Sequence, residues 1–308
     1  MKSNLGIILM LFAALCIPAF GQTTAKEWID NGVSLRDLGK YDEAIQDFDK
    51  AIELDPQNAE AYNNKGYSIG IYYDGRTNAS ANEEALEYFN KAIELDPQYA
   101  DAWNNKGIAL YYKGMYTEAI QAYENATRLD PEFAEAWYNK AIALQSLGKY
   151  NESIQTYDQV ININPGIEDA WYNKGTLLKK IGNYDEANKA LNKAIELNPE
   201  DAEAWNNKGI ALYYLGKYAE AIQAYENATR LDPGFTEAKN NEEIAIQKYN
   251  TSISALNNAT ELNPQERLTI KSSPKKTISD RGKIPLCLKE IRDDNGLILS
   301  PPRCDPLA

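Results

Sequence analysis

Small and aromatic residues recur along the chain at a fixed spacing of 34 residues. The stretches 100–133 and 202–235 differ at five of 34 positions and begin 102 residues apart, which is three such spacings. A fixed period of this length is typical of a repeat protein. Counted within each period, position 4 is aromatic, position 8 is small and position 32 is proline in all six full copies. The pattern therefore predicts one supersecondary unit that is repeated along most of the chain.

Each period predicts two short amphipathic helices. In the third copy, positions 4, 8 and 11 share one face of a first helix, and positions 20, 24 and 27 share one face of a second. Small residues at positions 8, 20 and 27 allow the two backbones to approach closely, and the aromatic residues fill the remaining space. A glycine such as Gly114 ends the first helix, and a proline such as Pro131 follows the second. One pair cannot bury its apolar face alone, so neighbouring pairs must stack.

The period divides the chain into six full repeats and a degenerate seventh. The repeats cover residues 25–58, 59–99, 100–133, 134–167, 168–201, 202–235 and, for the degenerate copy, 236–264. The second repeat carries seven extra residues within 72–84, which we expect to form a loop that is either functional or a neutral change of length. In the seventh, Lys239 and Glu243 replace the aromatic and the small residue, and three residues are missing, although the second-helix sequence is kept. We interpret it as a terminal cap.

The recurring W, G, Y, A, F or Y, A and P of these positions resembles the tetratricopeptide repeat (TPR) family. The resemblance implies an all-α fold, a right-handed superhelical solenoid of helix-turn-helix repeats over residues 22–264. It also implies a non-catalytic scaffold that binds an extended peptide or partner protein in a concave groove lined by the first helices.

Tyrosine and asparagine occupy the first-helix positions that line the groove in the family. Both residue types suit an adaptable recognition surface, because they combine rigid contact area with amide donors and acceptors. The predicted partner-binding residues are Asn63, Asn104, Asn105, Tyr111, Tyr112, Tyr138, Asn139, Tyr172, Asn173, Asn206, Asn207, Tyr213 and Tyr214. For the asparagines a second interpretation stays open, in which they satisfy helix ends and contacts between repeats.

Acidic residues at position 2 of the repeats indicate the charge of the partner. TPR domains that clamp the acidic C-terminus of chaperones carry lysine or arginine at positions 2 and 5, whereas position 2 here is Glu60, Asp101, Glu135, Asp169 and Glu203. We therefore expect a protein or peptide partner that is basic or neutral rather than acidic. Nucleic acid requires a basic stripe and is not expected as a partner.

The sequence lacks several residues and motifs that are typical of catalytic sites. It contains no histidine in 308 residues, and no nucleophile elbow, P-loop or CxxC pair. We therefore expect neither an enzyme nor a metal or cofactor site. The alternative to a binding scaffold is a structural or self-assembling spacer of the cell envelope.

The N-terminus has the plan of a secretory signal peptide. Lys2 precedes an apolar run over residues 5–20, and polar Gln22 follows Gly21. We expect residues 1–21 to be removed and the protein to be exported, either secreted or associated with the cell envelope. An uncleaved anchor is the alternative, for which the run is short. After signal removal, no integral membrane segment is expected.

Residues 265–308 lack the period and form a basic linker with a small cysteine-containing end. They hold nine Lys or Arg against six Asp or Glu, whereas the residues before them carry a net charge of −16. Because this charge is opposite to that of the repeats, the tail is a candidate internal ligand of the groove, with a mobile linker as the simpler alternative. Cys287 and Cys304 are either a disulfide of an oxidising compartment or two free thiols.

Six N-x-S/T sequons are candidate glycosylation sites. An asparagine-rich chain also produces such triplets by accident, and that alternative stays open. The sequons are at Asn78, Asn125, Asn151, Asn227, Asn250 and Asn258.

Overall fold

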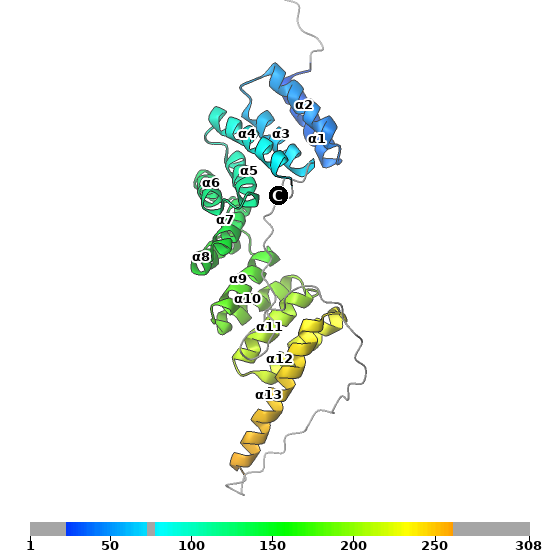
Figure 1. Ribbon diagram of the computed structural model, residues 1–308, viewed down its shortest axis with the longest axis vertical. Helices are drawn as coiled ribbons and strands as arrows, with labels where there is room; N and C mark the ends of the chain where they lie inside the picture. The colour runs from blue at the N-terminus through cyan, green and yellow to red at the C-terminus, as the bar shows by residue number, and fades with distance from the viewer. Residues whose placement is uncertain (1–22, 73–77, 261–308) are drawn as a thin grey trace, which may run out of the picture. The chain divides into compact units, whose positions relative to one another are not determined.

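The computed structural model describes residues 23–72 and 78–260. The signal segment, part of the insertion in the second repeat, and residues 261–308 with Cys287 and Cys304 lie outside these residues. Within them the chain forms thirteen helices and no strand, which confirms the predicted all-α repeat fold (Figure 1). The helices are α1 (Ala25–Asp37), α2 (Tyr41–Leu54), α3 (Ala59–Tyr72), α4 (Ala79–Leu95), α5 (Ala100–Tyr112), α6 (Tyr116–Leu129), α7 (Ala134–Ser146), α8 (Tyr150–Ile163), α9 (Glu168–Lys180), α10 (Tyr184–Leu197), α11 (Ala202–Tyr214), α12 (Tyr218–Leu231) and α13 (Thr236–Thr260).

The helices belong to two compact units. The first contains α1–α6 and the second α7–α13, with the division between Pro131 and Glu132. Within each unit, every first helix except α13 packs against the second helix of its own repeat, and that second helix packs against the first helix of the next repeat in the unit. Each unit is therefore a stack of helix pairs, as the need to bury one apolar face per pair requires.

The two helices of a repeat meet at the predicted small residue. A Cβ atom added to Gly107 would lie 2.5 Å from a ring carbon of Tyr123, and one added to Gly175 would lie 2.7 Å from Cγ of Leu191. Tyr123 and Leu191 are fully buried. Position 8 must therefore be small because the large residue at position 24 fills the space where its side chain would be.

The turn inside each repeat depends on a glycine in the left-handed region. Gly148 has a φ of +75°, and Lys149 N donates a 2.9 Å hydrogen bond to the carbonyl oxygen of Leu144. This bond satisfies a carbonyl group at the end of α7. The same conformation occurs at Gly39, Gly114, Gly182 and Gly216.

The seventh repeat differs from its sequence-based expectation. Its kept second-helix sequence does not form a separate helix, because α13 runs unbroken for 25 residues and Figure 1 shows it continuing past α12. The glycine of the turn is absent from this copy, and the three missing residues shorten the segment where the turn occurs elsewhere. Glu243 also stands at position 8, where the other copies have room only for a small residue. With no second helix to cover it, Ile246 at position 11 is 38% exposed, against 1% for Leu212 at the same position of α11.

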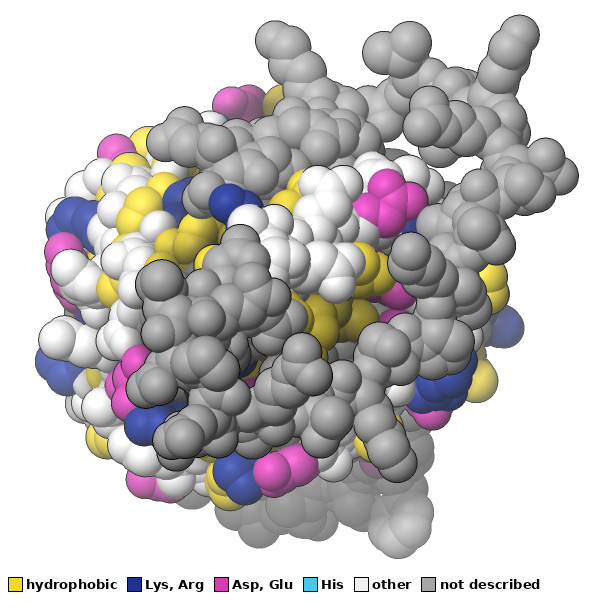
Figure 2. Space-filling model, turned by 90° about the horizontal axis from the view of Figure 1, so that it is seen from below, with side chains coloured by type: hydrophobic (Ala, Val, Ile, Leu, Met, Phe, Trp, Pro, Cys, Tyr) yellow, Lys and Arg dark blue, Asp and Glu magenta, His cyan; other side chains and the backbone are white. Residues whose placement is uncertain are grey.

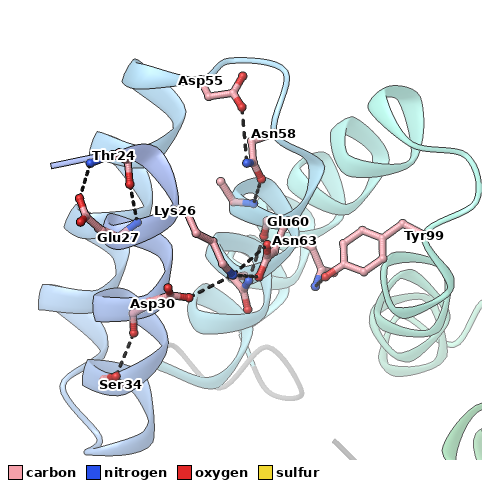
Figure 3. Close-up of polar contacts among 12 residues, drawn as sticks. Thr24, Lys26, Glu27, Asp30, Ser34, Asp55, Asn58, Glu60, Asn63 and Tyr99 are labelled. Atoms are coloured by element: carbon pink, nitrogen blue, oxygen red, sulfur yellow. Dashed lines mark hydrogen bonds and ion pairs between the residues drawn. The ribbon is translucent and has the colours of Figure 1, made fainter. Parts of the chain in front are cut away.

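Charged residues stand on the first described helix, α1, and on the last, α13. Position 3 is a fully buried alanine in every first helix from α3 to α13. In α1 it is Glu27, which is exposed and forms a capping box with Thr24 (Figure 3). At the other end Lys239 and Glu243 are exposed on α13. An exposed charge at these positions disfavours the stacking of a further repeat.

None of the helices in residues 23–72 and 78–260 is long and apolar enough to cross a membrane.

Candidate partner-binding surface

The thirteen predicted partner-binding residues divide into a buried and a partly exposed group. The partly exposed residues are Asn105, Tyr111, Tyr112 and Tyr214. The buried residues, none more than 5% exposed, are Asn63, Asn104, Tyr138, Asn139, Tyr172, Asn173, Asn206, Asn207 and Tyr213. The buried nine correct the sequence-based expectation, because their side chains offer a partner almost no surface.

The asparagines at position 6 connect successive repeats. Asn173 Nδ2 donates a 3.1 Å hydrogen bond to the hydroxyl of Tyr138, and Asn207 Nδ2 donates one of the same length to the hydroxyl of Tyr172. In the first unit, Asn105 Nδ2 donates to Oδ1 of Asn63 over 3.0 Å. Each bond joins position 6 of one repeat to position 5 of the repeat before it. Since buried amides need partners, this ladder supports the structural interpretation of the asparagines.

The acidic residue at position 2 takes part in the same contacts. The Tyr172 hydroxyl lies 3.0 Å from Oε2 of Glu203, and Asn206 Nδ2 donates to Oε1 of Glu237 over 2.7 Å. In the first unit, Lys26 Nζ lies 3.3 Å from Oε1 of Glu60 (Figure 3). We call Glu60, Asp101, Glu135, Asp169, Glu203 and Glu237 the acidic row. All six are partly or fully exposed, so the row keeps surface that a partner can reach.

A lysine at position 12 is buried in the second unit. Lys179 is 6% exposed, and its ammonium group donates to Oδ1 of Asn207. Burial lowers the pKa of Lys179 to about 8, and the carboxylate of Glu237 opposes that shift. In the first unit Arg36 fills the same position and donates to Oδ1 of Asn64 over 2.9 Å. The sequence analysis did not predict that a cation at position 12 binds the asparagine of the next repeat. The signal was present in the sequence, because in both units the cation precedes that asparagine by 28 residues.

The tyrosines at positions 12 and 13 pack against other aromatic rings. The rings of Tyr214 and Tyr184 are stacked, with centroids 4.6 Å apart. Tyr213 meets Tyr218 edge-on at 5.3 Å, and Tyr111 lies equally close to Tyr116. Packing therefore accounts for Tyr213, whereas the partly exposed edges of Tyr111, Tyr112 and Tyr214 remain as surface.

The tryptophan at position 4 carries a lysine over its ring, a feature that the repeat pattern did not predict. Lys208 Nζ lies 4.8 Å from the ring centroid of Trp205, and Lys106 Nζ lies 5.3 Å from that of Trp103. Burial lowers the pKa of both lysines. Lys174 lies over the ring of Trp171 in the same way and also pairs with Asp158 at 2.5 Å. Each of these cation–π contacts joins two residues of one first helix.

Charges of both signs lie on the face drawn in Figure 2. In the part of that face where described residues are visible, Lys and Arg side chains lie among Asp and Glu side chains. Among the described residues, no group of three or more Cys, Asp or Glu could hold a metal ion.

The sequons lie in different local settings. Asn78 is exposed and caps α4, where its Oδ1 accepts a 3.2 Å hydrogen bond from Ala81 N. Asn151 and Asn250 are exposed, whereas Asn125 and Asn227 are partly buried and donate Nδ2 to a backbone carbonyl of their own helix. The side chain of Asn258 lies outside the described residues. Glycosylation of these sites stays a prediction.

Solved structures with related folds include three repeat proteins. The structure titled "YrrB: a TPR protein with an unusual peptide-binding site" is 26% identical, with a TM-score of 0.56, and the alignment covers 64% of this chain and 97% of that one. Pseudomonas aeruginosa pilF is 21% identical with a TM-score of 0.60, over 70% and 95% of the two chains. MamA from Desulfovibrio magneticus RS-1 is 20% identical with a TM-score of 0.51, over 58% and 97%. These last two likenesses concern the fold alone.

Comparison of the sequence with protein-family models also identifies tetratricopeptide repeats. Models described as "Tetratricopeptide repeat" match residues 88–121, 134–166, 156–187 and 172–234, and a model described as "TPR repeat" matches residues 32–69 and 107–148. None of the curated proteins compared matches the chain. The matched segments together span more than half of the chain, and the protein belongs to the tetratricopeptide repeat family.

Proposed function

We propose that the protein is an exported, non-catalytic scaffold in which the acidic residues within one unit bind a neutral or basic extended segment of a partner protein. The observation that carries this proposal is the acidic row, because a carboxylate stands at position 2 of every first helix from α3 to α13. A surface with regularly spaced carboxylates attracts a basic segment and repels an acidic one.

Partly exposed tyrosine edges add apolar contact area at the other end of the same helices. Tyr111, Tyr112 and Tyr214 lie on first helices that also carry members of the row. Tyrosine gives a large contact area at a low cost in side-chain entropy. The similar structure whose title names a peptide-binding site agrees with binding of an extended segment.

The polar ends of the stack weigh against the alternative of a self-assembling spacer. Exposed Glu27 at one end and Glu243 at the other occupy positions that are alanine or another small residue inside the stack. A further copy that stacked end to end would have to remove these carboxylates from water.

Affinity capture with the full chain tests the binding proposal. One bait carries Asp101→Asn, Glu135→Gln, Asp169→Asn and Glu203→Gln in the row. A matched control loses four exposed acids of second helices, Glu87, Glu118, Glu220 and Glu226, through changes to Gln. We expect a protein that the unaltered chain and the control retain but the row variant loses. Equal retention by all three baits would place binding elsewhere.

Export has a separate test. In the native host, the mature protein is expected to begin at Gln22, as N-terminal sequencing would show. A chain that keeps Met1 would contradict it.

A further inference from the structure

The acidic row of the second unit crosses neighbouring helices. Asp169, Glu203 and Glu237 stand in the first turns of α9, α11 and α13, and α11 contacts both of the others. Glu135 occupies the same position of α7. First helices that pack in this way lie about 8–10 Å apart. The row therefore presents carboxylates at a spacing of about three residues of extended chain.

The described part of the second unit has an excess of negative charge. Residues 132–260 contain 18 Asp or Glu and 12 Lys or Arg. Lys179 is buried and donates to Asn207, so its ammonium group is not presented to the surface. Glu203 is exposed, and the hydrogen bond from Tyr172 fixes the position of its carboxylate. A fixed, exposed carboxylate suits recognition of a cation, since little side-chain entropy is lost on binding.

The chain itself carries a segment of opposite charge. Residues 267–283 hold six Lys or Arg and one Asp. They begin seven residues after α13 ends at Thr260. Since they are joined to the same unit, their effective concentration at the row is on the order of millimolar.

The length of the connection fits the geometry of α13. A helix of 25 residues is about 37 Å long, and eleven extended residues span about 36 Å. The chain from residue 261 to Lys271 is therefore long enough to return from the end of α13 to Glu237 at its start. Lys275, Lys276 and Arg281 follow within ten residues of Lys271, so the segment carries further cations beyond the point where it reaches Glu237.

We propose that residues 267–283 bind back onto the acidic row of the second unit and occupy it until a partner displaces them. This inference rests on the proposed function, because it assigns the row a competing ligand within the chain. The contact is made by exposed charges, so salt weakens it and a partner that adds apolar contacts replaces it.

A peptide competition experiment tests the proposal in the full chain. The probe is a fluorescent synthetic peptide of residues 267–283. One variant carries Lys271→Gln, Lys275→Gln and Lys276→Gln, and a matched control carries Lys289→Gln, Arg292→Gln and Arg303→Gln. In low salt we expect the first variant to bind the probe at least ~10-fold more tightly than the unaltered chain, because its own segment no longer competes. The control should bind like the unaltered chain. Equal binding by all three proteins, or by none, would overturn the proposal.

Carbodiimide cross-linking gives a second readout. In the unaltered chain, amide cross-links are expected between lysines of the segment and Asp169, Glu203 or Glu237, and they should disappear in high salt. Their absence in low salt would also overturn the proposal. If the row variant loses a captured partner although the probe never binds, the proposed function stands and this inference fails. If the probe binds as expected but the row variant captures the same proteins as the unaltered chain, this inference stands and the proposed function fails.

Discussion

Asn207 donates a 3.1 Å hydrogen bond to the hydroxyl of Tyr172 in the preceding repeat, and both side chains are fully buried. The bond joins α11 to α9 at a point that water does not reach. Asparagine and tyrosine are common on recognition surfaces, but here this pair joins two neighbouring repeats.

Loss of that amide should destabilise the second unit. Asn207→Ala removes the donor to Tyr172 and the acceptor of buried Lys179, so we expect the free energy of unfolding to fall by about 2–3 kcal/mol. Urea unfolding followed by circular dichroism measures it. Asn105→Ala is the matched control, since Asn105 makes a similar bond but is partly exposed, and its loss should be below about 1 kcal/mol. Equal losses of unfolding free energy in the two variants would contradict the idea that burial makes the Asn207 bond the more important one.

A methyl group added to a helical glycine should be costly only where the second helix is close. In Gly175→Ala the new Cβ would lie 2.7 Å from Leu191, and we expect a loss of about 1–3 kcal/mol. Gly70 lies inside α3, and a Cβ added there would meet nothing within 4 Å, so Gly70→Ala should be neutral or stabilise by up to about 1 kcal/mol. Thermal unfolding of the two variants compares them directly, and a stable Gly175→Ala protein would argue against close packing there.

The buried lysine should make stability depend on pH in alkaline solution. The pKa of Lys179 is about 8 in the folded chain, against an ordinary value of 10.5. The unfolded chain therefore binds the proton more strongly, and its protonation opposes folding below pH 8. As pH rises from about 8 to 10.5, the stability of the unaltered chain should increase relative to Lys179→Met, by up to about 3 kcal/mol. Urea titrations across this range measure the difference. Lys180→Met, which changes the neighbouring exposed lysine in the same way, is the matched control.

The continuous form of α13 predicts tolerance at Ile246. Ile246→Gln should change the free energy of unfolding by less than about 0.5 kcal/mol, because the side chain is 38% exposed. Leu212→Gln, at the equivalent buried position of α11, should cost about 2–5 kcal/mol. Comparable losses would mean that a second helix covers Ile246 after all.

The repeat pattern predicted the packing within a pair well, because it depends on residues of one repeat. Gly107 and Tyr123 are 16 residues apart, and their contact follows from helical spacing alone. The exposure of position 5 or 6 could not be predicted in this way, because it depends on the neighbouring repeat. Tyr138 and Asn173 suit recognition in isolation, and only the stacked helices place them against each other.

The single helix α13 shows a similar limit. The residues of its second half, from Tyr249 onward, follow the repeat pattern and predict a separate helix. The conformation instead depends on what is missing, a glycine that can adopt a positive φ and the three residues that would make the turn.

The third and sixth repeats are nearly identical in sequence but have different neighbouring helices. Tyr213 is 5% exposed while Tyr111, its counterpart, is partly exposed, although 29 of the 34 residues around them are the same. Within its unit α11 is followed by another first helix, whereas α5 is the last one of its unit. Two repeats of nearly the same sequence therefore share a fold but expose different side chains. The neighbouring helices, and not the repeat sequence alone, decide which tyrosine a partner can reach.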